Sequence, residues 1–307
     1  MEIFIDIIII AVCIAALWFG AVWVVGSASL IARRFGLSEL VIGLTIVAIA
    51  TSAPEFAVTV YAAFTGKAAI SVGNIVGSDI FNLGIILGIV ALHSILFISK
   101  TLFYRDGFLL FAAGILLVIF FRDLKLDWWE GLILFSTLVL YIYILIRQKY
   151  PVEEELPEGT FRWYHIPELI VGAAVIVTAA HFLVSSASDI ARFAGLSEWF
   201  IGITIVAAGT SAPELATSVA AIVKGKHGIS VGNLIGSDLF NMLGVLGVAS
   251  MLRPLRIQTS EYTGNIILAV SLGILLIMMR TGWKITKTEA VLLICIALFR
   301  WSFEFIF

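Results

Sequence analysis

One polar segment occurs twice in this chain, and each copy lies inside a long apolar run. The sequence Thr-Ser-Ala-Pro-Glu fills residues 51–55 and again residues 210–214, which is 159 positions later. A second shared block begins with Gly-Asn and ends with Gly-Ser-Asp-x-Phe-Asn, at residues 73–82 and 232–241, with the same offset. Acidic, hydroxyl and amide side chains are costly in hydrocarbon and serve a function where they occur there. Two copies in the same register predict a cation site.

Composition places the chain in a lipid bilayer. Hydrophobic residues make up 61% of its 307 residues and charged residues only 13%, whereas soluble domains are about a quarter charged. The length accommodates about ten spans of roughly 20 residues with short loops. No basic cluster suggests a nucleic-acid partner, and the sequence identifies no protein partner. We expect an all-α integral protein of the plasma membrane.

Apolar runs separated by charged or turn residues predict ten transmembrane helices. They form a first five-helix repeat at residues 1–147 and a second at 164–307, joined by a cytoplasmic linker at 148–163. The linker contains Pro151, Pro157 and a cluster of glutamates, and we interpret it as a solvated connector rather than a regulatory cation site. The expected helices are 3–32, 39–65, 70–98, 106–121, 127–147, 164–192, 198–223, 229–251, 262–280 and 286–305.

The two repeats are predicted to be inverted in the membrane. Residues 36–60 and 195–219 are identical at 17 of 25 positions, and residues 70–82 and 229–241 at 10 of 13. Because Gly, Pro, Asn, Asp and Glu match as well as apolar residues, chance similarity cannot explain the identity. Each half has an odd number of spans, so the second half enters from the opposite side. Inverted repeats of this kind are typical of secondary transporters that bind substrate near mid-membrane.

Loop charge predicts the orientation. Twelve Lys and Arg residues lie in the loops on the linker side and six on the opposite side, and positive loops face the cytoplasm. Both termini are therefore expected to be extracellular and the linker cytoplasmic. Trp128, Trp129, Trp163 and Trp199 fall near predicted span ends, as expected for aromatic side chains at the membrane interface.

Helices 2 and 7 are predicted to be broken. Pro54 lacks a backbone donor and clashes with the preceding turn, so we expect a break around residues 50–53 that frees the carbonyls near Ala48 and Thr51. Irregular backbone is tolerated in a membrane where it lines a cavity or is packed in protein. Glu55 then lies in the first turn of the continuing helix, where the helix dipole favours its ionised form. Helix 7 repeats the arrangement with Ala207, Thr210, Pro213 and Glu214.

Helix 3 carries a polar stripe, because Asn74, Ser78 and Asn82 are spaced i, i+4, i+8. Gly73 and Gly77 form a seam of small residues along which another helix can approach closely. Helix 8 repeats the stripe with Asn233, Ser237 and Asn241 and the seam with Gly232 and Gly236. Four segments are thus expected to converge, two with a glutamate and two with hydroxyl and amide oxygens.

The candidate ligands are all oxygen atoms, which favours a hard cation and disfavours zinc, copper and iron. Ca²⁺ accepts about six to eight oxygens in a flexible cage, whereas Mg²⁺ demands strict octahedral geometry. The carboxylates of Glu55 and Glu214 would neutralise one Ca²⁺, and Na⁺ accepts the same oxygens. Asp79 and Asp238 follow the stripe serines, turned about 100° around the helix. They are candidate ion ligands, proton sites or partners of other polar residues.

At these residues the chain resembles the cation/calcium exchanger superfamily, and most closely the sodium/calcium exchangers of prokaryotes. Thr-Ser-Ala-Pro-Glu is similar to the family's Gly-Thr-Ser-x-Pro-Glu, and Gly-Ser-Asp-x-Phe-Asn is similar to its third-helix motif. The resemblance covers essentially the whole chain through the two repeats. It implies antiport of Na⁺ against Ca²⁺ by alternating access.

The resemblance also implies roles for residues of this sequence. Glu55 and Glu214 would be the central calcium ligands, joined by the carbonyls of Thr51 and Thr210. Asn82 and Asn241 would complete the middle of the cluster. Serine hydroxyls and alanine carbonyls would shape flanking sodium sites, namely those of Ser52, Ser78, Ser211, Ser237, Ala48 and Ala207.

Other counter-ions and other classes of protein stand as alternatives. Proton/calcium exchangers of the superfamily usually carry a glutamate where this chain has Gly77 and Gly236, and potassium-dependent exchangers carry an aspartate where it has Asn241. Both departures favour sodium. A cation channel seldom needs two inverted halves with broken helices. No His-metal cluster, nucleophile elbow or phosphate loop in the sequence indicates an enzyme, and no cofactor is expected.

Overall fold

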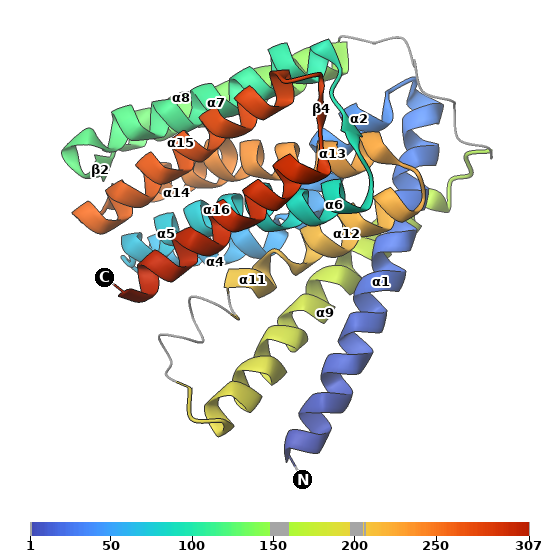
Figure 1. Cartoon of the computed structure of the whole chain (residues 1–307), viewed down its shortest axis with the longest axis horizontal. Helices are drawn as coiled ribbons and strands as arrows, with labels where there is room; N and C mark the ends of the chain where they lie inside the picture. Colours follow the sequence, from blue (N-terminus) through green and yellow to red (C-terminus); the bar gives the residue numbers. More distant parts are fainter. Residues whose placement is uncertain (1, 148–159, 197–204, 206, 307) are drawn as a thin grey trace. The chain divides into compact units, whose positions relative to one another are not determined.

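The computed structural model describes residues 2–147, 160–196, 205 and 207–306, and these are almost entirely helical (Figure 1). The chain divides into two compact units. Unit 1 comprises Met1–Pro54 and Gln148–Asn233, and unit 2 comprises Glu55–Arg147 and Leu234–Phe307. Each unit therefore contains parts of both sequence repeats. The acidic cluster of the predicted linker and Trp199 lie outside the described residues.

Unit 1 is organised around two long helices from different repeats. Helix α1 (Glu2–Phe35) lies beside α9 (His165–Phe193) (Figure 1). A Cβ atom on Gly20 would lie 3.0 Å from the carbonyl oxygen of Gly172, and a Cβ atom on Gly172 equally close to that of Gly20. Glycine at both positions is what allows the two backbones to approach. The other elements are α2 (Glu39–Ile42), η1 (Gly43–Val47), α3 (Ala48–Thr51), α11 (Ala207–Thr210), α12 (Ala212–Val223) and the first part of α13 (His227–Leu239).

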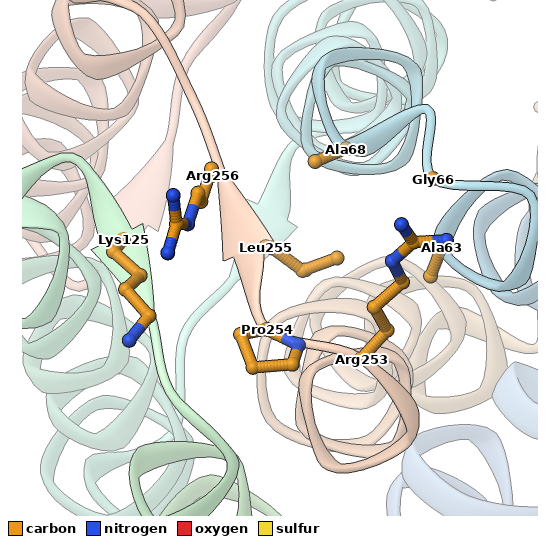
Figure 2. Close-up of a pocket in the computed structure, with 8 residues that line it drawn as sticks. All are labelled: Ala63, Gly66, Ala68, Lys125, Arg253, Pro254, Leu255 and Arg256. Carbon is orange, nitrogen blue, oxygen red and sulfur yellow. The ribbon is translucent and has the colours of Figure 1, made fainter.

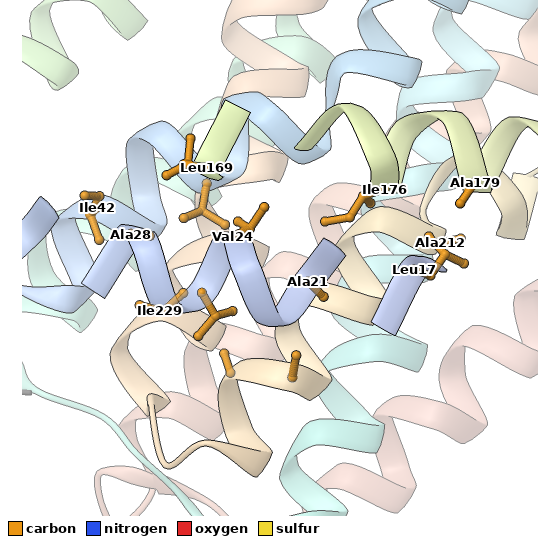
Figure 3. Packing of buried hydrophobic residues seen from close by; sticks show 14 of the residues in the cluster. Leu17, Ala21, Val24, Ala28, Ile42, Leu169, Ile176, Ala179, Ala212 and Ile229 are labelled. Carbon is orange, nitrogen blue, oxygen red and sulfur yellow. The ribbon is translucent and has the colours of Figure 1, made fainter. Parts of the chain in front are cut away.

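The core of unit 1 is a cluster of apolar side chains on one face of α1 (Figure 3). Leu17, Ala21, Val24 and Ala28 follow helical spacing and are buried. Because lipid is as apolar as these side chains, close packing holds the helices together more than removal from water does. The cluster continues through Leu169, Ile176 and Ala179 of α9 and through Ile42, Ala212 and Ile229.

The second span is broken, as predicted. Helix α3 ends at Thr51 and α4 (Ala53–Phe64) begins after Ser52, and the two parts of this span are bent by 52°. Ser52 has φ −80° and ψ 12°. Ser211 lies at the corresponding point between α11 and α12 and has φ −87° and ψ 8°. The same departure from helical ψ in both repeats confirms that the sequence Ser-Ala-Pro interrupts both helices.

The helices of unit 2 pack in pairs. Helix α8 (Trp128–Arg147) contacts α14 (Leu246–Leu252) through a second glycine pair, because a Cβ atom on Gly247 would lie 3.0 Å from the carbonyl oxygen of Gly131. Helix α7 (Phe108–Phe120) packs on α15 (Thr259–Arg280), and α6 (Leu87–His93) packs on α16 (Lys287–Ile306). Unit 2 also contains α5 (Ala68–Ile80), the 3₁₀ turn η4 (Phe121–Asp123) and the π-helical segments η2 (Phe81–Ile86), η3 (Leu102–Gly107) and η6 (Phe240–Val245).

Short antiparallel strand pairs join loops of unit 2, and the sequence did not predict them. Strand β1 (Leu96–Phe97) pairs with β4 (Lys284–Ile285), and β2 (Lys125–Leu126) pairs with β3 (Leu255–Arg256). One apolar side chain of each strand is buried. The pairing satisfies backbone donors and acceptors between the spans, where a buried loop would otherwise leave them without partners.

The described residues contain enough long apolar helices to make the chain an integral membrane protein. Seven helices within the described ranges can cross a membrane by length and composition, or eight if the bent span Glu39–Phe64 is counted. The two remaining predicted spans correspond to α12, which follows residues that are not described, and to α16. The described helices therefore support a polytopic membrane protein without reaching the predicted count of ten.

Candidate functional site

Glu214 is a fully buried acid of unit 1. It lies in the first turn of α12, just after the break at Ser211, and is fully buried. The hydroxyl of Ser52, at the break of the second span, donates a hydrogen bond of 3.0 Å to Oε1 of Glu214. Burying a carboxylate is unfavourable unless donors or cations compensate it. The hydroxyl of Ser52 orients the carboxylate of Glu214. Because it donates in this bond, the lone pairs of the serine oxygen can still bind a cation.

The side chain of Asn233 makes hydrogen bonds to the helices on either side of it near Glu214. Its Nδ2 donates to Oγ of Ser218 at 3.0 Å and to the backbone carbonyl of Glu214 at 3.4 Å. Its Oδ1 accepts a hydrogen bond of 3.0 Å from the hydroxyl of Thr51. The side-chain amide therefore ties α13 both to α12 and to the end of α3. Asn233, predicted only as part of a polar stripe, is a supporting residue of the site.

Glu55 has a matching environment in unit 2. It lies in the first turn of α4 and is fully buried, and its Oε1 accepts a hydrogen bond of 3.0 Å from the hydroxyl of Ser78 on α5. Nδ2 of Asn74 donates to Oγ1 of Thr59 at 3.0 Å and to the backbone carbonyl of Glu55 at 3.4 Å. These contacts repeat those of Asn233 with Ser218 and Glu214 at the same offset of 159 residues. The two acids thus have the same local support.

Two aspartate–asparagine pairs connect the repeats within unit 2. Nδ2 of Asn82 donates to Oδ1 of Asp238, and Nδ2 of Asn241 donates to Oδ1 of Asp79, both at 2.9 Å. All four residues are fully buried. Both aspartates are therefore hydrogen-bond partners of other polar residues, while their roles as ion ligands or proton sites stay predictions. The asparagines lie in the π-helical segments η2 and η6, and such segments are frequent at functional sites.

The pairing with aspartate engages the amide nitrogens of the two asparagines but not their side-chain oxygens. Within the described part of the chain, Oδ1 of Asn82 and Oδ1 of Asn241 are buried and accept no hydrogen bond. Their amide nitrogens are held by the aspartates, so the amides cannot flip to bring a donor to the same place. A buried carbonyl oxygen without a donor is costly, and a hard cation would satisfy it.

The carbonyl of Ala48 differs from the prediction. It accepts the backbone N–H of Ser52 at 3.0 Å and the hydroxyl of Thr51 at 3.2 Å. The break was expected to leave this oxygen without a partner, and that expectation is wrong because α3 keeps its last helical hydrogen bond. The candidate ligand residues Thr51, Thr210, Ser211 and Ser237 are buried. Ala207 begins α11.

Sequence reasoning missed the supporting role of the residue four positions after each glutamate. The hydroxyls of Thr59 and Ser218 accept hydrogen bonds from the side-chain amides of Asn74 and Asn233, respectively. The backbone carbonyls of the same two residues accept hydrogen bonds of 3.0 Å from the hydroxyls of Ser71 and Ser230. Their signal in the sequence is a hydroxyl residue at the same offset of 159 positions. Among the described residues no group of three or more His, Cys, Asp and Glu side chains could hold a metal.

Known proteins resemble this chain over nearly its full length. The pattern of the sodium/calcium exchanger protein family matches residues 5–147 and 166–300. The putative antiporter CaxA of Alkalimonas amylolytica is 34% identical over 292 residues, which cover 91% of each chain. The sodium/calcium exchanger MaX1 of Methanosarcina acetivorans is 32% identical over 323 residues, covering 89% of this chain and 91% of that protein. A structure of the sodium-calcium exchanger NCX_Mj, soaked with zero Na⁺ and Ca²⁺, matches with a TM-score of 0.85 and 28% identity, covering 97% of this chain and 98% of that one.

The fold and family are those of a membrane transporter and not of an enzyme. This chain belongs to the sodium/calcium exchanger protein family. The resemblance drawn from the two repeated motifs is therefore confirmed, and so is the predicted class of antiporter.

Proposed function

We propose that Glu55 and Glu214 are the carboxylate ligands of a transported Ca²⁺ ion, which the protein exchanges for Na⁺. The observation that carries this proposal is the repeated support of the two acids. Each is fully buried at the start of a helix that follows a break, and each accepts a serine hydroxyl at 3.0 Å. Acidic residues inside membrane spans mark ion pathways by default, and matched support at both makes a merely structural role implausible.

We assign the remaining oxygens by position in the two motifs. The Oδ1 atoms of Asn82 and Asn241, buried and without a hydrogen bond among the described residues, support a role for these residues as ion ligands. Asp79 and Asp238 would hold those amides in place rather than contact the ion. The other assigned residues are Thr51 and Thr210 for Ca²⁺, and Ser52, Ser78, Ser211, Ser237, Ala48 and Ala207 for Na⁺.

The charge of the ligands dictates how exchange responds to voltage. Two glutamates give the empty site a formal charge of −2, which one Ca²⁺ neutralises. If more than two Na⁺ replace it, the loaded site carries a net positive charge, and each turnover moves charge across the membrane. The exchange is then electrogenic, and a potential of 100 mV acts on each moved charge with about 2.3 kcal/mol.

Alternating access requires elements that move past the site. Helices α1 and α9 carry acidic residues only near their ends and cross through the pair Gly20 and Gly172. A smooth contact of small residues suits a sliding gate, and we assign that role to this helix pair. The architecture we propose has ten spans in two inverted repeats, with domains at 1–147 and 164–307, extracellular termini and a cytoplasmic linker at 148–163. The repeat offset of 159 residues and the loop charges support it.

Proteoliposomes distinguish the counter-ions. Vesicles loaded with Na⁺ and diluted into Na⁺-free buffer containing ⁴⁵Ca²⁺ should accumulate the isotope, and the uptake should collapse when Na⁺ is equal on both sides. Uptake that follows a pH gradient and ignores Na⁺ would establish a proton antiporter instead. Uptake that requires K⁺ together with Na⁺ would establish a potassium-dependent exchanger.

The same vesicles distinguish exchange from conduction. Vesicles preloaded with ⁴⁵Ca²⁺ should release it when Na⁺ is added outside and should retain it in choline. Release in choline at the same rate would show a cation channel and would exclude a coupled exchange.

A further inference from the structure

A basic cavity lies in unit 2 (Figure 2). It has a volume of about 410 Å³ and lies between the turn that joins α4 to α5 and the paired strands β2 and β3. Cavities of roughly 300–1,000 Å³ are large enough for a small ligand or a headgroup. Its polar side chains are those of Lys125, Arg253 and Arg256.

The strand register places two of these cations directly opposite each other. Lys125 of β2 is the register partner of Arg256 of β3, and like charges on directly opposed strand positions are destabilising. Asp127 forms an ion pair with Lys125. Within the described residues no carboxylate pairs with Arg253 or Arg256, and the nearby Glu261 is engaged by the backbone N–H of Gln258. The described lining of the cavity therefore contains three cations and no carboxylate, and Asp123 and Asp127 lie beside Lys125.

Arg253 is held by backbone rather than by an acid. Its Nη1 donates to the carbonyl of Phe64 at 3.3 Å. The guanidinium lies over Gly66, where a Cβ atom would come within 2.8 Å of Nη1 and where φ is +81°. Glycine at this turn both adopts the left-handed conformation and leaves room for the guanidinium. Most donors of Arg253 remain available to a ligand, because a guanidinium carries five N–H groups.

The residues around the cavity are of the kinds found at the surface of a bilayer. Trp128 and Trp129, at the start of α8 just after β2 and Asp127, are exposed, as tryptophans at the membrane–water interface are. Phe64 and Leu252, next to the cavity at the ends of α4 and α14, are exposed apolar side chains. An anion that enters from this side meets arginines at headgroup depth and apolar side chains beside them. In the orientation proposed above this cavity lies on the extracellular side, so the lipid would come from the outer leaflet. Arginine guanidinium groups bind phosphate oxygens through paired charge-assisted hydrogen bonds.

We propose that this cavity binds the phosphate of an anionic phospholipid headgroup, with Arg253 and Arg256 as its donors. The exposed Phe64 and Leu252 favour a lipid over free phosphate, because they offer contact to acyl chains. Ala68, the first residue of α5, also lines the cavity, and its helix has no side-chain cap, so the helix dipole adds a favourable field. The proposal goes beyond ion exchange and is independent of it.

The binding test uses the full chain in detergent with added phosphatidylglycerol, read by native mass spectrometry. Each arginine near a membrane surface contributes about fivefold to the binding of an anionic lipid. We expect Arg256→Gln to weaken phosphatidylglycerol binding about fivefold and the Arg253→Gln/Arg256→Gln variant about thirtyfold. Arg33→Gln/Arg34→Gln, with the same loss of charge at the end of α1, is the matched control and should bind like the wild type.

Competition separates the two sources of phosphate. Phosphatidylcholine and inorganic phosphate should neither occupy the site nor raise the unfolding temperature, whereas phosphatidylglycerol should do both. Equal binding of phosphatidylglycerol by the double variant and the wild type would overturn the site. Equal protection by inorganic phosphate would overturn the assignment to lipid. If the double variant does not fold, the binding of phosphatidylglycerol by Arg256→Gln alone tests the site. This substitution should not disturb the fold, because the side chain of Arg256 makes no hydrogen bond or ion pair among the described residues.

Discussion

The hydroxyl of Ser52 donates a hydrogen bond to Oε1 of Glu214 at 3.0 Å, across 162 positions of sequence and from one repeat to the other. The orientation of Glu214 therefore depends on the backbone break in the first repeat. Asn233 reinforces the same connection, because it binds both Thr51 and the backbone of Glu214. The geometry at this acid is the product of both repeats and not of one.

Removing the charge of either glutamate should abolish exchange. Glu55→Gln and Glu214→Gln keep the size of the side chain but leave a single formal charge for a divalent ion. We expect Na⁺-driven ⁴⁵Ca²⁺ uptake to fall to the level of empty vesicles in each variant. Asp189→Asn, at an exposed surface ion pair with Arg192, should transport like the wild type. Full activity in either glutamine variant would contradict the assignment of both acids to one transported ion.

The hydroxyl of Ser52 should tune ion affinity rather than abolish it. A hydrogen bond to a charged group contributes about 1.5–3 kcal/mol, so Ser52→Ala should raise the Ca²⁺ concentration for half-maximal uptake by about 10-fold or more. Ser52→Thr keeps the hydroxyl and should recover most of the affinity. Ser271→Ala removes a hydroxyl that bonds only within its own helix, to Ile267, and should leave the half-maximal concentration unchanged.

The pair of Asp238 and Asn82 should stabilise the fold and align the amide. Asp238→Ala leaves the buried amide of Asn82 without its acceptor, which costs about 1–3 kcal/mol. The unfolding temperature in detergent should fall, together with the ion affinity. Asp238→Asn keeps an acceptor oxygen and should be milder.

Swapping the residues at positions 82 and 238 tests the interaction between them. The variant Asn82→Asp/Asp238→Asn reverses donor and acceptor and should recover part of the unfolding temperature lost in Asp238→Ala. The stability losses of the single variants Asn82→Asp and Asp238→Asn are measured separately. If the double variant loses more stability than the sum of these two losses, the hydrogen bond between the two residues does not explain their contribution to the fold.

The crossing of α1 and α9 should tolerate no added side chain. In Gly20→Ala the new methyl group would lie 2.8 Å from Cγ1 of Ile176 and 3.0 Å from the carbonyl oxygen of Gly172. Overpacking of this kind costs about 1–3 kcal/mol, so the unfolding temperature should drop. Gly26→Ala, on the same helix, would approach only Nζ of Lys224 at 3.7 Å and serves as the control. Equal unfolding temperatures for the two variants would argue against a close glycine contact.

The broken helices and the burial of the acids could be predicted because they follow from local chemistry. Pro54 removes a donor wherever it stands, and the offset of 159 residues transfers each conclusion to Pro213. The partners of Asp79 and Asp238 could not be predicted in this way. Each aspartate binds an asparagine of the other repeat, and one helix face gives no information about what a distant segment brings to it.

The features that the sequence did not indicate depend on contacts between distant loops. Strands of two residues, such as β1 and β2, are too short to show an alternating pattern. They form because Leu96 and Leu126 are buried where two loops meet. The basic cavity has the same origin, since Lys125 and Arg256 are 131 positions apart and become neighbours only through strand pairing.

The reciprocal hydrogen bonds of Asn241 to Asp79 and of Asn82 to Asp238 have an evolutionary consequence. Residue i of one copy binds residue j of the other, and the reverse, which is the pattern of an isologous interface in a homodimer. An ancestral protein with a single copy of the motif would have formed both bonds simply by dimerising. Fusion of two genes would then have joined the copies in one chain, and these four positions would have stayed constrained because each copy still needs its partner.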